Sequence, residues 1–207
     1  MGGPGLDAVV MAGGLGTRLQ MGEKPLVKLL SRSLISYVLK ALKESSVDRV
    51  FVAITPNSPQ TKRWVQKEEI KVVDTPGKGY VPDMIYAVEK ANIKEPVLIV
   101  MADLPLLNGN IIDEILEVYQ DVPQPALSVH TPLQIHQTIG IKPNSLFNYQ
   151  GQFIVPAGVN VLDGSQIRFE QSDYHLIIDR AELALNVNTV KDLKICESIL
   201  KGEIKVL

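Results

Sequence analysis

Three glycines in the segment MAGGLGTR, Gly13, Gly14 and Gly16, follow an apolar run and precede two cations, Arg18 and Lys24. Glycine allows sharp turns that bring backbone N–H groups close to an anion, and the cations add positive charge. The spacing matches neither GxxxxGK[ST] nor GxGxxG, which excludes these two phosphate-binding loops. The residues alone leave two interpretations open: an anion site of another kind, or an ordinary turn with solvated cations.

The elements that must position this loop alternate along the first 120 residues. Strands are expected at Asp7–Met11, Arg49–Thr55, Ile70–Asp74 and Val97–Met101. Helices are expected over 34–42, from Ser58-Pro59, from Pro82, and over 111–119. Single helices between strands predict a Rossmann-like, doubly wound α/β fold, with a mainly parallel sheet covered on both faces. Ligands of such sheets bind beyond the carboxyl ends of the strands, where the glycines lie.

The second half of the chain is less regular and begins at a joint marked by Pro123 and Pro125. Strands are expected at Ala126–His130, Gln137–Ile141 and Phe153–Leu162, before a closing helix at Thr189–Lys201. These additions predict a mixed sheet. A length of 207 residues favours one domain, 1–207, with residues 1–5 as a loose start.

Composition excludes several classes of function. A net charge of -2 gives no general attraction to nucleic acid or to an anionic membrane. The single cysteine, Cys196, excludes an internal disulfide, suits a cytoplasmic protein, and has the helical spacing of a buried structural thiol. No apolar run is long enough for a membrane span. Core or surface roles are favoured over catalysis for the three histidines, which are His130, His136 and His175.

The extended motif MAGGLGTRLQMGEKP resembles the signature of nucleotidyltransferases, which join the α-phosphate of a nucleoside triphosphate to an acceptor phosphate and release pyrophosphate. The resemblance implies that the loop, from Ala12 through Gly13, Gly14 and Gly16 to Thr17, holds the triphosphate. It also implies that Arg18 meets the outgoing phosphates and that Lys24 lies near the α-phosphate. Both reactants are anionic, so alignment and charge neutralisation are the main requirements of catalysis. An acceptor phosphate is already ionised, so no general base is needed.

Asp103, in the segment MADLPLL, directly follows the fourth expected strand. Its carboxylate could bind Mg²⁺ or could begin the turn before Pro105. The resemblance to nucleotidyltransferases implies the metal-binding role. In DTPGKGYVPD, Lys78 and Gly79 follow the third strand, and their position at the carboxyl edge favours contact with the nucleotide over a plain loop.

Two later segments complete the expected site. In VPAGVNVL, Gly158 permits close approach of a ligand or backbone, and Asn160 is its polar neighbour in the same strand. In LNVNTVKDL, Thr189 and Asp192 have the spacing of a helix capping box. The resemblance implies that this segment returns to the metal and phosphates, with Asn188 as a second polar ligand.

Over nearly its whole length, through PNSPQTK, DTPGKGY and NVNTVKDL, the chain resembles the archaeal adenosylcobinamide-phosphate guanylyltransferases. The resemblance implies GTP as donor, adenosylcobinamide phosphate as acceptor, Mg²⁺ as cofactor, and a role in coenzyme B12 synthesis. It divides the chain into a nucleotide-binding half, 6–122, and an acceptor-binding half, 123–207. A homodimer is compatible with it.

Three points stay open at this stage. The guanine reader could be backbone groups of Thr75–Tyr80 or an acidic side chain such as Asp83. The acceptor could instead be a molybdopterin or a sugar or alcohol phosphate. The chain could also be a regulatory subunit that binds nucleotide without turnover, although Arg18, Lys24 and Asp103 argue for catalysis.

Overall fold

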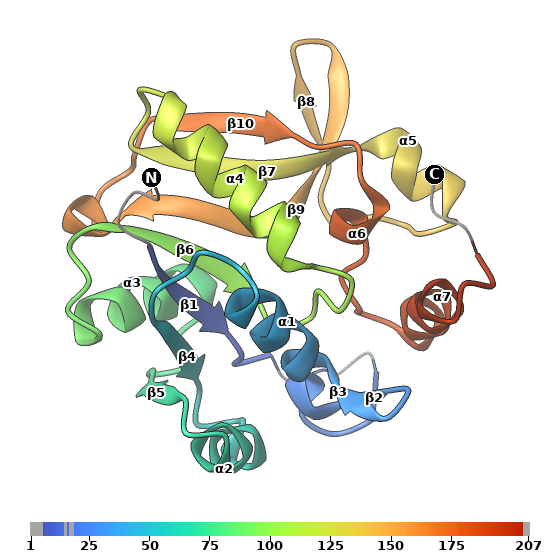
Figure 1. Ribbon diagram of the computed structural model, residues 1–207, viewed down its shortest axis with the longest axis horizontal. Coiled ribbons are helices and arrows are strands. Elements are labelled where there is room, and N and C mark those ends of the chain that lie inside the picture. Colours follow the sequence, from blue (N-terminus) through green and yellow to red (C-terminus); the bar gives the residue numbers. More distant parts are fainter. Residues whose placement is uncertain (1–5, 15, 17–18, 205–207) are drawn as a thin grey trace.

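The computed structural model describes residues 6–14, 16 and 19–204, which form layers around one mixed sheet (Figure 1). The strand order is β10-β7-β9-β6-β1-β4-β5, and β8 pairs with β9. The strands are β1 Asp7–Met11, β4 Val50–Ile54, β5 Lys71–Asp74, β6 Pro96–Met101, β7 Ala126–Pro132, β8 Phe147–Tyr149, β9 Gln152–Asp163 and β10 Asp173–Ile177. A separate two-stranded sheet pairs β2 Lys28–Leu29 with β3 Arg32–Ser33.

The four strands that the first half contributes to the main sheet are parallel. β1 pairs with β4 and β6, and β4 pairs with β5. β9 runs antiparallel to both β6 and β7, and β10 is parallel to β7. The expected doubly wound, mainly parallel but mixed sheet is therefore confirmed.

Helices cover both faces of the sheet. They are α1 Leu34–Lys43, α2 Pro59–Lys67, α3 Tyr80–Lys90, α4 Gly109–Asp121, α5 Leu133–Thr138, α6 Ala181–Ala184 and α7 Val190–Leu200, with short 3-10 turns η1 Lys24–Leu26 and η2 Gly164–Gln166. In Figure 1, α1 and α4 lie in front of the sheet and α3 lies behind it. No helix in the described part of the chain is long and apolar enough to cross a membrane.

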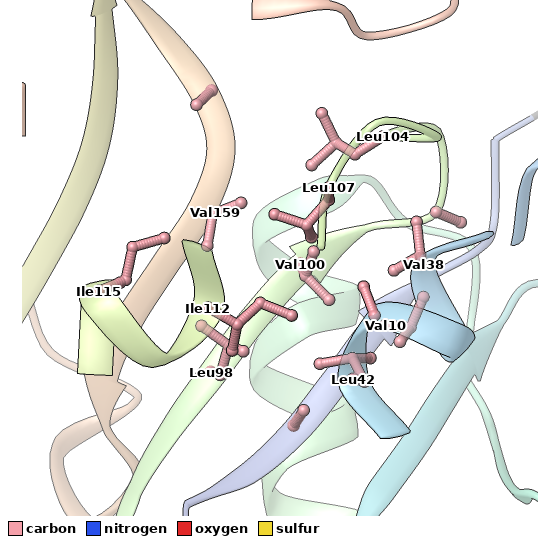
Figure 2. Packing of buried hydrophobic residues seen from close by; sticks show 14 of the residues in the cluster. Val10, Val38, Leu42, Leu98, Val100, Leu104, Leu107, Ile112, Ile115 and Val159 are labelled. Carbon is pink, nitrogen blue, oxygen red and sulfur yellow. The ribbon is translucent and has the colours of Figure 1, made fainter. Parts of the chain in front are cut away.

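Alternation along the buried strands divides the core between these faces. Val10, Leu98 and Val100 point to the side of α1 and α4, while Val9 and Ile99 point to the side of α3. Successive side chains of a strand point to opposite faces, so a fully apolar strand contributes side chains to the core on both sides of the sheet. Figure 2 shows the first layer, in which side chains of α1 and α4 meet those of the sheet: Val10, Val38, Leu42, Leu98, Val100, Ile112, Ile115 and Val159.

A third apolar cluster lies outside the sheet and joins three distant parts of the chain. It contains Leu19, Val27, Leu29, Leu34, Leu106, Leu185, Val187 and Cys196, all buried. Cys196 on α7 is fully buried, as its spacing predicts, and burial raises the pKa of its thiol to about 12. The cluster fixes α7 and the segment before it against the loop that follows β1.

Two expectations about elements are wrong. Gln137–Ile141 is not a strand: α5 covers its start, and Gly140 then turns at φ +72°. A left-handed glycine directly after a helix is a common stop signal, and the isoleucines around it had suggested a strand. The third helix begins at Tyr80, two residues before Pro82, because a proline in the first helical turn loses no intrahelical hydrogen bond.

Candidate active site

The site forms where β1 and β6 end side by side. Met11 and Met101 are direct neighbours in the sheet, and the N–H of Ala102 donates to the carbonyl of Met11 at 3.2 Å. The glycine loop after β1 and Asp103 after β6 therefore emerge at the same carboxyl edge. This is the edge at which ligands of doubly wound sheets bind.

Lys24, Asp103 and Asn188 meet at this edge although 164 residues separate the first from the last. The Lys24 ammonium forms an ion pair with the Asp103 carboxylate and donates to Asn188 Oδ1 at 2.8 Å. Asn186 Nδ2 lies 3.5 Å from Asp103 Oδ1. The N–H of Val187 donates to the Asp103 carbonyl at 3.0 Å, which holds the two asparagines beside the carboxylate.

Lys24 is held in place by its neighbour Glu23, a residue that the sequence analysis did not single out. The Glu23 carboxylate accepts hydrogen bonds from the N–H groups of Gln60 and Thr61 and from the Thr61 hydroxyl, at 2.6–2.8 Å. These donors lie in the first turn of α2, where the helix dipole favours negative charge. A glutamate aimed at a distant helix gives no local sequence signal, so only the fold shows this anchor.

A capping box fixes the segment that carries Asn188. The Asp192 carboxylate accepts from the N–H groups of Asn188 at 2.9 Å and Thr189 at 2.8 Å, and the Thr189 hydroxyl accepts from the Asp192 N–H at 3.2 Å. The predicted box is thus confirmed. It orders the start of α7, so the Asn188 amide reaches Lys24 from a rigid backbone.

A cavity of about 1050 Å³ opens beside the Lys24–Asp103 pair. Its walls come mainly from the second half of the chain, including α5, the segment after it, and the start of α7. Lys142 and Lys191 bring positive charge to these walls, and Leu133, Val155 and Pro156 bring apolar surface. The cavity can therefore hold a large ligand that carries both apolar and anionic parts.

A second cavity, of about 290 Å³, lies between the glycine loop and the segment that follows β5. Gly13 and Gly14 line one side, and Gly77 and Gly79 line another. Met101 lines both cavities, so the two adjoin at the end of β6. The described residues that line the smaller cavity all lie from Met11 to Met101, in the first half of the chain.

Gly158 brings β9 close to the site, as expected of a glycine in that strand. Its φ is +79°, and a Cβ there would lie 2.9 Å from Met101 Cγ and 3.1 Å from Asn186 Nδ2. Both distances are shorter than ordinary contacts, so any side chain at this position would push Met101 or Asn186 out of place.

The other expected residues are distributed as follows. Ala12 is fully buried directly after β1, and its N–H donates to the Ala53 carbonyl at 3.0 Å, so its backbone is bound to β4. The Lys78 side chain is exposed and lines neither cavity. Asn160 is half-buried, also lines neither cavity, and forms a side-chain hydrogen bond with Tyr80. Gly16 turns at φ +59° against Lys24. Thr17 and Arg18 lie outside the described residues.

Two of the histidines are buried, in line with the expected core roles. His136 Nε2 lies 2.8 Å from the Thr131 hydroxyl, and His130 Nδ1 lies 3.1 Å from the Ser128 carbonyl. Burial lowers the pKa of both imidazoles. Burial therefore favours the neutral form of both rings.

Comparisons with known proteins identify the family of the chain. A model of the MobA-like NTP transferase domain matches residues 8–153. Adenosylcobinamide-phosphate guanylyltransferase of Methanocaldococcus jannaschii is 37% identical over 208 residues, which cover 96% of this chain and 99% of that protein. The bifunctional protein GlmU of Thermodesulfovibrio yellowstonii is 31% identical over 117 residues, 55% of this chain and 25% of GlmU.

Two solved structures share the fold. CMP:2-keto-3-deoxy-manno-octonic acid synthetase complexed with CTP gives a TM-score of 0.72 at 14% identity, covering 97% of this chain and all of that one. A hypothetical transferase from Thermus thermophilus gives 0.69 at 14% identity, covering 91% of this chain and 99% of that one. The domain match and the full-length M. jannaschii relative establish that the chain is a nucleotidyltransferase of the MobA-like NTP transferase family.

Proposed function

We propose that this protein transfers the guanylyl group of GTP to adenosylcobinamide phosphate, giving adenosylcobinamide-GDP and pyrophosphate. The observation that carries the proposal is the 37% identity to the M. jannaschii guanylyltransferase, which spans 96% of this chain and 99% of the relative. The cavity of about 1050 Å³ supports it, because a corrinoid is a large acceptor with extensive apolar surface.

The reaction is an in-line displacement at phosphorus. A phosphate oxygen of the acceptor attacks the α-phosphorus of GTP, and a new P–O bond forms. The bond from the α-phosphorus to the oxygen that bridges to the β-phosphate breaks, and its electron pair leaves on pyrophosphate. The attacking oxygen carries no proton, so the protein need only align two anions and neutralise developing charge.

The two cavities support separate binding sites for the two substrates. GTP would place its base in the smaller cavity and its phosphates along Gly13, Gly14 and Gly16, and the acceptor would occupy the larger cavity. Lys24 lines the larger cavity, and Gly14 lies beside its side chain, so its ammonium is well placed to meet the reacting phosphate. The smaller cavity is lined within 6–122 and the larger one mainly within 123–207, in support of the proposed halves.

The side chains around Asp103 fit a magnesium ion held jointly with the substrate. Mg²⁺ prefers oxygen ligands and binds through one or two carboxylates together with phosphates and water. Asp103 offers a carboxylate and Asn188 offers an amide oxygen, Oδ1, and both of these oxygen ligands contact the Lys24 ammonium. Within the described part of the chain no group of three or more His, Cys, Asp or Glu could hold a metal alone. Bound Mg²⁺ would supply positive charge to the triphosphate.

Transfer of label from GTP tests the proposed chemistry. With adenosylcobinamide phosphate as acceptor, label in the α-phosphate should move to the corrinoid, and label in the γ-phosphate should leave with pyrophosphate. Lys24→Ala should lower turnover at saturating substrates at least about 100-fold, as the loss of one group that stabilises the transition state does. Lys67→Ala, at the exposed end of α2, is the matched control and should keep normal turnover.

The result that would refute this assignment is normal turnover of Lys24→Ala. Label that moves instead to a molybdopterin or to a sugar or alcohol phosphate would favour the rival acceptors. Tight GTP binding without transfer to any acceptor would favour a regulatory subunit. The homodimer stays a prediction, which the mass of the protein in solution would test.

A further inference from the structure

We propose that the Asp83 carboxylate selects guanine over adenine in the smaller cavity, an inference that rests on the proposed use of GTP. Asp83 lies in the first turn of α3 and is only 4% exposed. It lines the smaller cavity, between Gly79 and the ends of the strands. Among the described residues that line this cavity it is the one with a charged side chain.

The two oxygens of this carboxylate have different surroundings. Oδ1 accepts hydrogen bonds from the N–H of Gly77 at 2.9 Å and from the N–H of Lys78 at 3.1 Å. The described part of the chain provides no hydrogen bond to Oδ2. A buried carboxylate is costly unless its oxygens are hydrogen-bonded. Oδ1 therefore holds the Gly77–Gly79 loop, while Oδ2 is left as an acceptor for a ligand.

An unused acceptor in this cavity matches the Watson–Crick edge of guanine. Guanine presents two adjacent donors there, the N1–H and the N2 amine. Adenine presents a lone pair at N1, which would face the carboxylate without a proton between them. An ionised carboxylate can only accept hydrogen bonds, so it binds the donors of guanine and leaves the N1 acceptor of adenine desolvated and unpaired.

The same geometry explains how one residue could serve both the loop and the base. By accepting hydrogen bonds from the backbone of Gly77 and Lys78, Asp83 fixes the wall of the cavity against which the base would lie. A purely structural role would support every nucleotide equally. A role in selection would instead act on the difference between guanine and adenine, which is the quantity that an experiment should measure.

Calorimetric titration of GTP, ITP and ATP into the unmodified protein and into Asp83→Asn tests the proposal. In Asp83→Asn the amide oxygen can still accept from the loop, while the amide NH₂ replaces the Oδ2 acceptor by a donor. Glu89→Gln is the matched control, because it makes the same charge change on the same helix and Glu89 lines neither cavity. ITP keeps the N1–H and lacks the N2 amine, so it separates the two donors.

The unmodified protein and Glu89→Gln should bind GTP about 100-fold or more tighter than ATP, with ITP between them. Asp83→Asn should bind GTP at least about tenfold more weakly and ATP within about threefold of the unmodified protein. In the unmodified protein, GTP methylated at N1 should also bind at least about tenfold more weakly than GTP, a result that needs no variant.

An unchanged ratio of GTP to ATP affinity in Asp83→Asn, beside a clear preference in the unmodified protein, would overturn the role of Asp83 and leave the proposed function intact. Equal affinities for GTP and ATP in the unmodified protein would overturn both the guanine donor and this inference.

Discussion

Gly13 is the residue of the glycine loop for which the structure makes the sharpest prediction. A Cβ at this position would lie 2.2 Å from the γ-methyl carbon of Thr55 and 3.3 Å from Thr55 Cβ and Oγ1. The first distance is more than an ångström too short for two carbons, whereas the other two need only a small adjustment. Gly13→Ala should therefore destabilise the protein, because its Cβ would clash with the γ-methyl group of Thr55.

We expect Gly13→Ala to lower the free energy of unfolding by about 1–3 kcal/mol, the usual cost of overpacking. Thr55→Ser removes the offending methyl and should itself cost about 1 kcal/mol in lost burial. In the double variant the new methyl group occupies the vacated space, so the total cost should stay near about 1 kcal/mol. The favourable coupling between the two sites is then at least about 1 kcal/mol.

Urea unfolding followed by circular dichroism at pH 7 measures the free energy of unfolding of the unmodified protein, the two single variants and the double variant. Gly14→Ala is the matched control, because a Cβ there would meet only Lys24 Cδ at 3.7 Å, an ordinary contact, and stability should change by less than about 0.5 kcal/mol. Additive costs for Gly13→Ala and Thr55→Ser would refute the close contact. A stable Gly13→Ala single variant would do the same.

Three further predictions follow from other parts of the molecule. Gly158→Ala should lower turnover at least about tenfold in a steady-state assay, because its Cβ would displace Met101 or Asn186. Gly151→Ala is the control: it has the same left-handed backbone strain but open space around its Cβ, so it should keep normal turnover. Native Cys196 should resist iodoacetamide at pH 8, since its pKa is about 12, and react after denaturation; labelling of the native protein seen by mass spectrometry would contradict its burial. Burial lowers the pKa of His130 and His136 in the folded protein, so the unfolded chain binds protons first as the pH falls below about 6.5. Stability should then fall between pH 7 and pH 5 by up to about 1.4 kcal/mol per pH unit for each ring, and His136→Gln should reduce that slope in urea unfolding; an unchanged slope would count against the shift.

The parallel half of the fold could be predicted because its signals are local. Buried strands such as Val97–Met101 are continuous apolar runs, and helices such as α1 have a strong apolar stripe. The strand β10 could not be predicted, because Asp173–Ile177 mixes polar and apolar residues at the edge of the sheet and is defined by its pairing with β7. α5 was not predicted, because six residues carry too little periodicity to define a helix, and the strand expected at Gln137–Ile141 overlaps only its end.

The candidate site shows the same division between local and distant information. The glycine loop and the capping box of α7 could be predicted because their residues are neighbours in sequence. The anchoring of Glu23 to α2 could not, since its partners lie 37 and 38 residues away. That Lys24 contacts both Asp103 and Asn188 likewise depends on the order of the strands, because β1 and β6 are adjacent only in the folded sheet.

The reaction of GTP with a corrinoid phosphate at this site can be followed as pyrophosphate release by the purified protein, with Mg²⁺ and each of the four ribonucleoside triphosphates, with and without adenosylcobinamide phosphate. We expect release with GTP only when the corrinoid is present, and far less with the other three triphosphates. No release from that pair, or equal release with a different acceptor, would contradict this expectation.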